Sequence, residues 1–138
     1  MSDYRRRLAV VLTVPLLAAG CGAAGGGDQQ SSPEAVVSAV YNHIAAGEFE
    51  QVCALVLPDA RSQFTAAGTD CQTFLAHHCD PQGRDAFRDV RVDPAKFRRN
   101  GDTAVVPEAG VTFGGRPSND ADTLTVRQDG KWWITIGR

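Results

Sequence analysis

Apolar residues recur at helical spacing between residues 32 and 47. The spacing places one apolar stripe on a single helix face, made of Val36, Val37, Val40, Tyr41 and Ile44. Ser32 suits the N-cap of this helix, Pro33 its first turn, and Gly47 its end. We therefore predict a helix that begins at Pro33 and ends before Gly47.

Shorter helices are predicted between residues 48 and 79. The segment before Pro58 places on one helix face Phe49, Val52, Cys53 and Val56. A short helical turn is expected over residues 59–64. Thr69 or Asp70 can cap one more helix, which has on one side Cys71, Phe74, Leu75 and His78. The first half of the chain is therefore predicted to be helical.

After residue 89 the pattern changes to the alternation of strands. Turn sequences at Asn100-Gly101 and Asp129-Gly130 predict two hairpins, and residues 111–120 predict a strand followed by a loop. The adjacent Trp132 and Trp133 must face opposite sides of their strand. One face of the last hairpin is expected to carry Leu124, Val126, Trp132, Ile134 and Ile136. Helices followed by antiparallel strands predict an α+β fold.

The amino end has the pattern of an export signal over residues 1–20. Three arginines at 5–7 precede Leu8–Ala19, an uncharged run of twelve residues. As a helix this run would reach roughly 18 Å, which is short of a hydrocarbon core about 30 Å thick. A buried helix of a cytosolic protein is the alternative, and Pro15 in the middle of the run disfavours it.

Small residues precede Cys21 and a glycine-rich segment follows it. The sequence Ala18-Ala19-Gly20-Cys21 resembles the lipobox of bacterial lipoproteins, and this resemblance implies that Cys21 is lipidated and becomes the first mature residue. An ordinary cleavage site beside a stray cysteine remains the alternative. Residues 22–32 contain no large apolar side chain, so residues 21–32 are predicted to be an anchor and flexible tether for a domain at 33–138.

Charge and cysteine content narrow the choice of partners and compartment. The formal net charge is −2 for the whole chain, and no run of one sign stands out, so a nucleic-acid partner is not expected. Cysteines outside the cytoplasm tend to pair. Cys71 and Cys79 would lie about 12 Å apart on a helix, too far to bridge. We therefore prefer a disulfide between Cys53 and Cys71, with Cys53–Cys79 as the alternative.

Two segments of the predicted domain resemble a known superfamily. "AVVSAVYNHIAAGEFEQVCALV" (35–56) and "LTVRQDGKWWITIG" (124–137) are similar to the first helices and closing strands of small exported domains of the nuclear-transport-factor-2-like, or cystatin-like, type. The resemblance implies N-terminal helices packed on a curved antiparallel sheet, a cone with an apolar pocket. Actinobacterial lipoproteins of this type often carry cysteines where this chain has Cys53 and Cys71.

Enzymes that resemble this fold place an Asp, His or Tyr inside the cone as acid or base. Tyr41 is expected to be a core residue with its hydroxyl at the rim, and His43 is expected to be exposed. The carboxylates that can point inward near the first strand are Asp85, Asp89 and Asp93. The adjacent His77 and His78 point about 100° apart on a helix, so no metal site is expected. No catalytic residue or cofactor is assigned.

Three functional hypotheses follow for an extracytoplasmic, lipid-anchored protein of the cell membrane. The first is a binding or accessory domain for a small apolar ligand or an envelope partner protein. The alternative is a cone-pocket isomerase or dehydratase that uses acid–base catalysis. A structural role in envelope assembly without a ligand is the third. The lack of a clear inward carboxylate favours the first.

Overall fold

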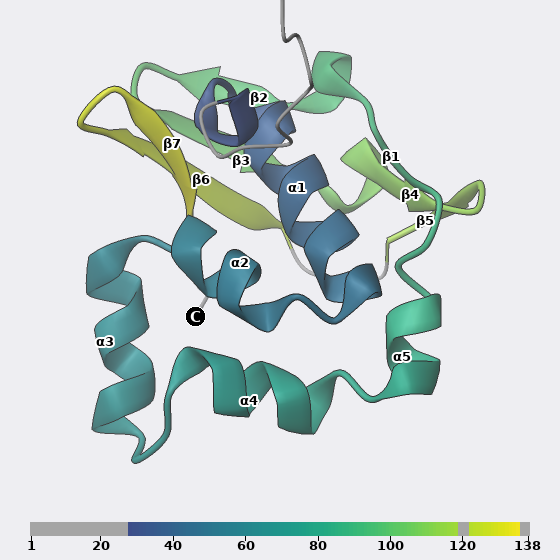
Figure 1. Ribbon diagram of the computed structural model, residues 1–138. Coiled ribbons are helices and arrows are strands. Elements are labelled where there is room, and N and C mark those ends of the chain that lie inside the picture. The colour runs from purple at the N-terminus through teal and green to yellow at the C-terminus, as the bar shows by residue number, and fades with distance from the viewer. Residues whose placement is uncertain (1–27, 119–121, 136–138) are drawn as a thin grey trace, which may run out of the picture.

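The computed structural model describes residues 28–118 and 122–135 (Figure 1). Cys21, the predicted signal segment and most of the predicted tether lie outside the described residues, as does Ile136. A short 3-10 helix, η1 (Asp28–Gln30), leads into the first helix. The described part of the chain therefore begins at the last residues of the predicted tether.

Five helices make up the first half of the described chain. They are α1 (Pro33–Ala46), α2 (Phe49–Leu55), α3 (Pro58–Ala66), α4 (Cys71–His78) and α5 (Pro81–Asp85). The Ser32 side chain accepts a hydrogen bond from the Ala35 amide, and Gly47 ends α1 with a φ of 74°. Asp70 rather than Thr69 caps α4, because its carboxylate accepts from the Thr73 amide. The predicted ends of the first helix are confirmed.

The strands form two antiparallel sheets. The order β1-β4-β5 makes a small sheet from β1 (Val90–Val92), β4 (Val111–Phe113) and β5 (Arg116–Pro117). The order β2-β3-β6-β7 makes a larger one from β2 (Arg98–Asn100), β3 (Thr103–Val106), β6 (Thr123–Gln128) and β7 (Lys131–Ile134). The α+β prediction is confirmed, and neither sheet closes into a barrel. The expected single curved sheet is instead divided into two.

Two 3-10 turns divide the sheets. The first, η2 (Pro94–Lys96), separates β1 from β2, and the second, η3 (Glu108–Gly110), separates β3 from β4. Pro94 begins one turn and Pro107 precedes the other, and neither proline has an amide hydrogen for a strand ladder. The chain therefore leaves the small sheet at η2 and returns to it at η3.

The core fills the space between α1 and both sheets. In Figure 1, α1 lies between the small sheet and the four-stranded sheet. Val36 and Val37 are fully buried in a cluster that also contains Ala104, Val111 and Trp132. Side chains therefore occupy the region where the family resemblance implies an apolar pocket.

The β6–β7 hairpin corrects one predicted face. Asp129 and Gly130 both have positive φ, 53° and 74°, which is the type I′ turn expected of Asp-Gly. This turn pairs Gln128 with Lys131, so Trp132 lies opposite Arg127. The prediction that Leu124 and Val126 share a face with Trp132 and Ile134 is wrong. The two-residue turn between β6 and β7 places Leu124 and Val126 on the face opposite to Trp132 and Ile134.

The β2–β3 hairpin turns one residue later than predicted. Asn100 pairs with Thr103, so the two residues of the turn are Gly101 and Asp102 rather than Asn100 and Gly101. Gly101 has a φ of 58°, the left-handed conformation that glycine adopts without steric cost. The glycine therefore sets the position of the turn.

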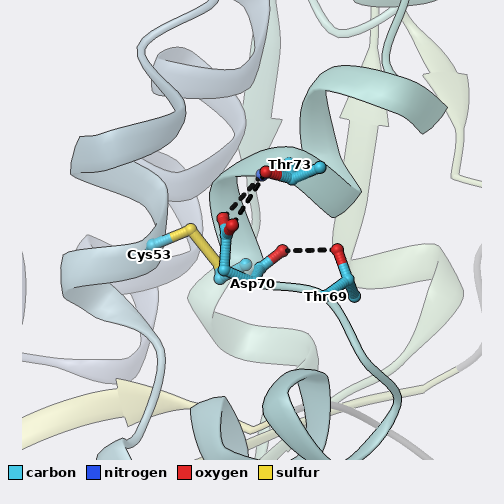
Figure 2. The surroundings of a disulfide bond; sticks show 5 residues. Cys53, Thr69, Asp70 and Thr73 are labelled. Atoms are coloured by element: carbon cyan, nitrogen blue, oxygen red, sulfur yellow. Dashed lines mark hydrogen bonds between the residues drawn. A yellow bond between two sulfur atoms is a disulfide. The ribbon is translucent and has the colours of Figure 1, made fainter.

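A disulfide joins α2 to α4, as predicted. The Cys53 and Cys71 sulfur atoms are bonded, and their Cα atoms lie 5.9 Å apart. Figure 2 shows the bond beside the Asp70 cap at the start of α4. Cys79 is a free cysteine, half-buried against the main core. Within residues 28–118 and 122–135, no helix is long and apolar enough to cross a membrane.

Candidate functional site

Three aromatic side chains from distant parts of the chain meet beside the small sheet. Tyr41 of α1 stacks on Phe87 with ring centroids 5.6 Å apart, and Phe113 of β4 meets Tyr41 edge-on at 4.9 Å. Phe87 and Phe113 are also edge-to-face, with centroids 5.2 Å apart. Such pairs add about 0.5–1.5 kcal/mol each beyond the burial of their area. The three rings therefore hold α1, the segment after α5 and β4 together.

An open cleft of about 580 Å³ lies at this cluster, and we call it the aromatic cleft. Phe87 and Phe113 line it, together with Arg88, Asp89 and Arg116. The register places Val90, Phe113 and Arg116 side by side across β1, β4 and β5, so these side chains share one face of the small sheet. An apolar wall with charged groups at its rim is typical of sites for small ligands.

The charges at the aromatic cleft are largely exposed. Arg88 Nε lies 2.9 Å from the Asp85 carboxylate in an ion pair that solvent screens. Arg116 extends from β5, the outer strand of the small sheet. Asp89 has a φ of 55° in the turn before β1, and its backbone oxygen accepts from the Gly114 amide. The rim therefore carries both signs of charge.

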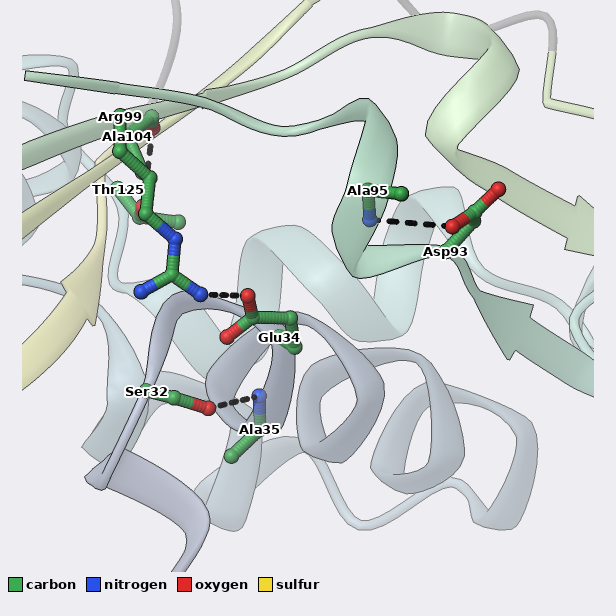
Figure 3. Close-up of polar contacts among 8 residues, drawn as sticks. All are labelled: Ser32, Glu34, Ala35, Asp93, Ala95, Arg99, Ala104 and Thr125. Carbon is green, nitrogen blue, oxygen red and sulfur yellow. Dashed lines mark hydrogen bonds and ion pairs between the residues drawn. The ribbon is translucent and has the colours of Figure 1, made fainter.

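The three aspartates considered for acid–base chemistry do not point into the core. Asp85 pairs with Arg88, Asp89 lies exposed in a turn, and Asp93 is exposed and accepts from the Ala95 amide at 3.1 Å. None of these three candidate aspartates points inward, since all three are exposed. Asp93 serves as the cap of η2, and Figure 3 shows this contact.

His43 is more enclosed than expected. Its side chain is 16% exposed, because Glu48 and Gln29 lie on either side of the ring. Nδ1 is 2.6 Å from a Glu48 carboxylate oxygen, and Nε2 is 3.3 Å from the Gln29 side-chain oxygen. These contacts link the end of α1 to η1. His43 therefore has a structural role at the start of the described chain.

His77 and His78 lie on the exposed surface of α4. The His78 ring stacks on Phe74 at 4.1 Å, and its Nδ1 is 2.8 Å from the Phe74 backbone oxygen. In the part of the chain that the structure describes, no three His, Cys, Asp or Glu side chains gather as a metal site would need. The two adjacent histidines are thus surface residues of the helix.

The buried polar side chains of the described residues do not ionise. They are Gln30, Ser118 and Thr125. The Thr125 hydroxyl donates to the Ala104 backbone oxygen at 2.9 Å, and Gln30 bonds the Trp132 backbone oxygen at 3.0 Å. Figure 3 also shows Glu34 of α1 paired with Arg99 of β2, at the edge of the core. The buried polar positions of the described residues thus hold no ionisable group, whereas Tyr41 and Cys79 are half-buried against the core.

Sequence reasoning identified Tyr41 but missed its two partners. Phe87 lies in the Arg- and Asp-rich stretch 84–99, whose charge pattern favours a solvated face. Phe113 ends a short strand before Gly114-Gly115. A lone aromatic residue beside a turn is a weak local signal, and only the packing of α1 on the small sheet brings the three rings together.

The disulfide and the aromatic cleft are the features that bear on function. Disulfides persist in oxidising compartments, so the Cys53–Cys71 bond is consistent with an extracytoplasmic domain. The cleft combines an aromatic wall with an open mouth. Comparison of the chain with protein-family models, curated proteins and solved structures finds no match in any of the three.

Proposed function

We propose that this protein is an exported lipoprotein, anchored through Cys21 at the extracytoplasmic face of the cell membrane. Its domain, residues 33–138, would be of the nuclear-transport-factor-2-like type and would bind a small apolar ligand in the aromatic cleft. Alternatively, the cleft would bind an apolar side chain of an envelope partner protein.

The anchor is supported by the amino-terminal pattern and by the disulfide. The apolar run at 8–19, the small residues before Cys21 and the glycine-rich segment after it are typical of a lipoprotein signal. Each buried acyl methylene contributes about 0.8 kcal/mol, so a diacylglycerol would hold the domain firmly. The Cys53–Cys71 bond is consistent with the oxidising conditions at the extracytoplasmic face of the membrane.

The family assignment is supported by where the two resembling segments lie. Residues 35–56 form α1 and α2, and the described part of 124–137 forms the closing β6–β7 hairpin. Helices that precede antiparallel strands are the arrangement that the resemblance implies. The division into two sheets and the filled core depart from that arrangement.

One observation carries the binding role. Phe87 and Phe113 present an aromatic wall to an open cleft, whereas the buried polar side chains of the described residues cannot act as acids or bases. Acid–base catalysis needs a titratable group with a suitable pKa beside the substrate, and the carboxylates at the cleft, Asp85 and Asp89, are exposed to solvent. The geometry therefore favours binding over isomerase or dehydratase chemistry.

The anchor is tested by the intact mass of the protein extracted from membranes of its own host. We expect the mass of a chain that begins at Cys21 plus a diacylglycerol. Alkylation of the unfolded protein before reduction should modify one thiol, Cys79, and alkylation after reduction should modify three. A mass without lipid would contradict the anchor.

The binding role is tested with N-phenyl-1-naphthylamine, an uncharged apolar dye that fluoresces when buried. The Cys21→Ser chain, exported without lipid, removes the need for detergent. Phe87→Ala should weaken dye binding by about tenfold to a hundredfold, because the lost aromatic contact is worth about 1.5–3 kcal/mol.

Phe74→Ala is the matched control, since Phe74 is 38% exposed on α4 and lies outside the aromatic cleft. We expect it to leave dye binding unchanged. Phe87→Leu retains apolar volume and shows whether weaker binding reflects the cleft or partial unfolding. Equal dye binding by the wild type and folded Phe87→Ala would contradict the proposed site.

A further inference from the structure

The side of the four-stranded sheet that faces away from α1 carries an apolar patch. The register places Val105 beside Leu124, and Val126 beside Trp133. We call these four residues the outer patch. Their neighbours along the strands, Ala104, Thr125 and Trp132, point to the opposite face and are buried in the core.

The outer patch is more apolar than the solvent face of such a sheet usually is. An antiparallel sheet with one face on the core normally has polar residues on the other. Leu124 is 38% exposed, and it and Phe74 are the exposed large hydrophobic residues of the described chain. Val105, Val126 and Trp133 are half-buried by one another. A contiguous apolar patch on a surface marks a contact with another molecule or with lipid.

Among the described residues, one ion pair and one further cation lie beside the outer patch. Arg98, opposite Val105 on β2, bonds the Asp122 carboxylate at 2.7 Å. Lys131 lies two residues before Trp133 on the same face of β7 and adds a single positive charge. The surroundings therefore have no strong field of one sign, and an apolar contact rather than a charged one dominates here.

The predicted tether enters the domain at β7, an edge strand of the four-stranded sheet. The Gln30 side chain of η1 is buried and donates to the Trp132 backbone oxygen at 3.0 Å. This bond holds η1 against β7, the strand that also carries Trp133. Six residues separate Cys21 from Asp28, so the span between them is at most about 25 Å. A lipid on Cys21 would therefore keep β7 close to the bilayer.

We propose that the outer patch rests on the bilayer that holds the anchor, with Trp133 at the level of the lipid headgroups. The inference rests on the proposed lipidation of Cys21. Tryptophan is suited to this depth, because its ring is apolar and its N–H is polar. The Trp133 Nε1 donates to the Gln128 backbone oxygen, so the ring is already oriented on the sheet surface.

This orientation keeps the aromatic cleft away from the lipid. In Figure 1, β6 and β7 lie on one side of α1, whereas β4 and β5 lie on the other. The cleft belongs to β4, β5 and the segment after α5. A bilayer against the outer patch would therefore leave the cleft mouth accessible to ligands or partners.

The test uses the full lipidated protein in phosphatidylcholine vesicles that contain brominated lipid, a quencher of tryptophan fluorescence. We expect quenching in the wild type and its loss in Trp133→Phe, because the remaining Trp132 is buried in the core. Addition of phosphatidylglycerol should change the result little, since Lys131 is a single positive charge beside the patch. Trp133→Phe with Phe74→Trp places the probe on α4, and we expect no quenching there.

The outcomes separate the docking from the anchor. If the protein sediments with vesicles and Trp133 is not quenched, the outer patch does not touch lipid and this inference is wrong while the anchor stands. If the protein neither sediments with vesicles nor carries lipid in its mass, the proposed anchor is wrong, and this inference, which rests on it, is wrong as well. A third outcome is that Trp133 of the wild type is not quenched and that the Trp133→Cys variant forms a crosslink between two copies. The outer patch would then contact a second copy of the chain, and the bilayer inference would be wrong.

Discussion

At the scale of single residues, Cys79 and Asp70 show how position sets side-chain chemistry. Cys79 lies just after α4, half-buried against the main core. Burial raises the pKa of its thiol, the positive charge of Arg84 lowers it by a smaller amount, and the negative charge of Asp80 raises it slightly further. The thiolate is the reactive form of cysteine, so the folded protein holds this thiol in its unreactive state near neutral pH.

Cys79 is therefore expected to react slowly with iodoacetamide in the native protein. The rate should rise with pH further into the alkaline range than for an exposed thiol, because the raised pKa delays formation of the thiolate. Mass spectrometry of timed samples at several pH values gives the rate. The protein in denaturant is the control, and equal rates in both states would contradict this environment for Cys79.

Asp70 is expected to make the protein more stable at a pH above the pKa of its carboxyl than at a pH below it. The Thr73 amide, and then the Thr73 hydroxyl, hold the pKa of this carboxyl below its ordinary value of 3.8. A depressed pKa contributes stability that is present at neutral pH and is lost as pH falls through the folded value. Asp70→Asn keeps an oxygen for the cap but removes the charge.

The expected result is a small loss of stability for Asp70→Asn at pH 7 and a smaller one at pH 2. Urea unfolding at the two pH values measures this difference. A loss that is independent of pH would show that the carboxylate charge does not contribute through the cap.

At the scale of elements, the sequence predicts helix caps and tight turns better than it predicts how the strands are arranged in sheets. The Ser32 cap, Gly47 and the Asp129-Gly130 turn depend on residues within a few positions of one another, and sequence reveals them. The division into two sheets depends on how Pro94 and Pro107 redirect the chain. The faces of β6 follow from the register, which the turn between β6 and β7 sets.

Removal of the disulfide is expected to loosen α4 more than α1. Cys71 is the buried residue of α4, and the bond ties this helix to α2 across 18 positions of sequence. The double change Cys53→Ser and Cys71→Ser should lower the free energy of unfolding by about 3 kcal/mol. Urea unfolding measures the loss, and amide hydrogen exchange should rise first in α4.

Cys79→Ser is the matched control for this change, since it removes a sulfur without opening the bond. We expect a smaller loss of stability and no change in the order of exchange. If the double variant unfolds at the same urea concentration as the wild type, the bond adds nothing to the folded state.

At the scale of the whole molecule, contacts between distant segments decide both the core and the candidate site. Tyr41, Phe87 and Phe113 come from three separate elements. No local pattern links them, so the sequence could predict a core tyrosine but not the aromatic cleft. The outer patch is likewise visible only when β3, β6 and β7 are placed in register.

The hydrogen bond from Gln30 of η1 to β7 is a contact between distant segments that one substitution can test. Gln30→Ala removes the donor to the buried Trp132 backbone oxygen, which should cost about 1–3 kcal/mol. Thermal unfolding measures the loss, and limited proteolysis should cleave more readily near η1. Gln63→Ala is the matched control, because Gln63 is exposed on α3.

The division of the strands also has an evolutionary consequence. The chain leaves the small sheet at η2, builds the β2–β3 hairpin, and returns at η3 to build β4 and β5. Mutations in the β4–β5 hairpin can therefore change the cleft wall without altering the pairing of the four-stranded sheet. Drift in one short hairpin can thus reshape the cleft while the pairing of the four-stranded sheet is inherited unchanged.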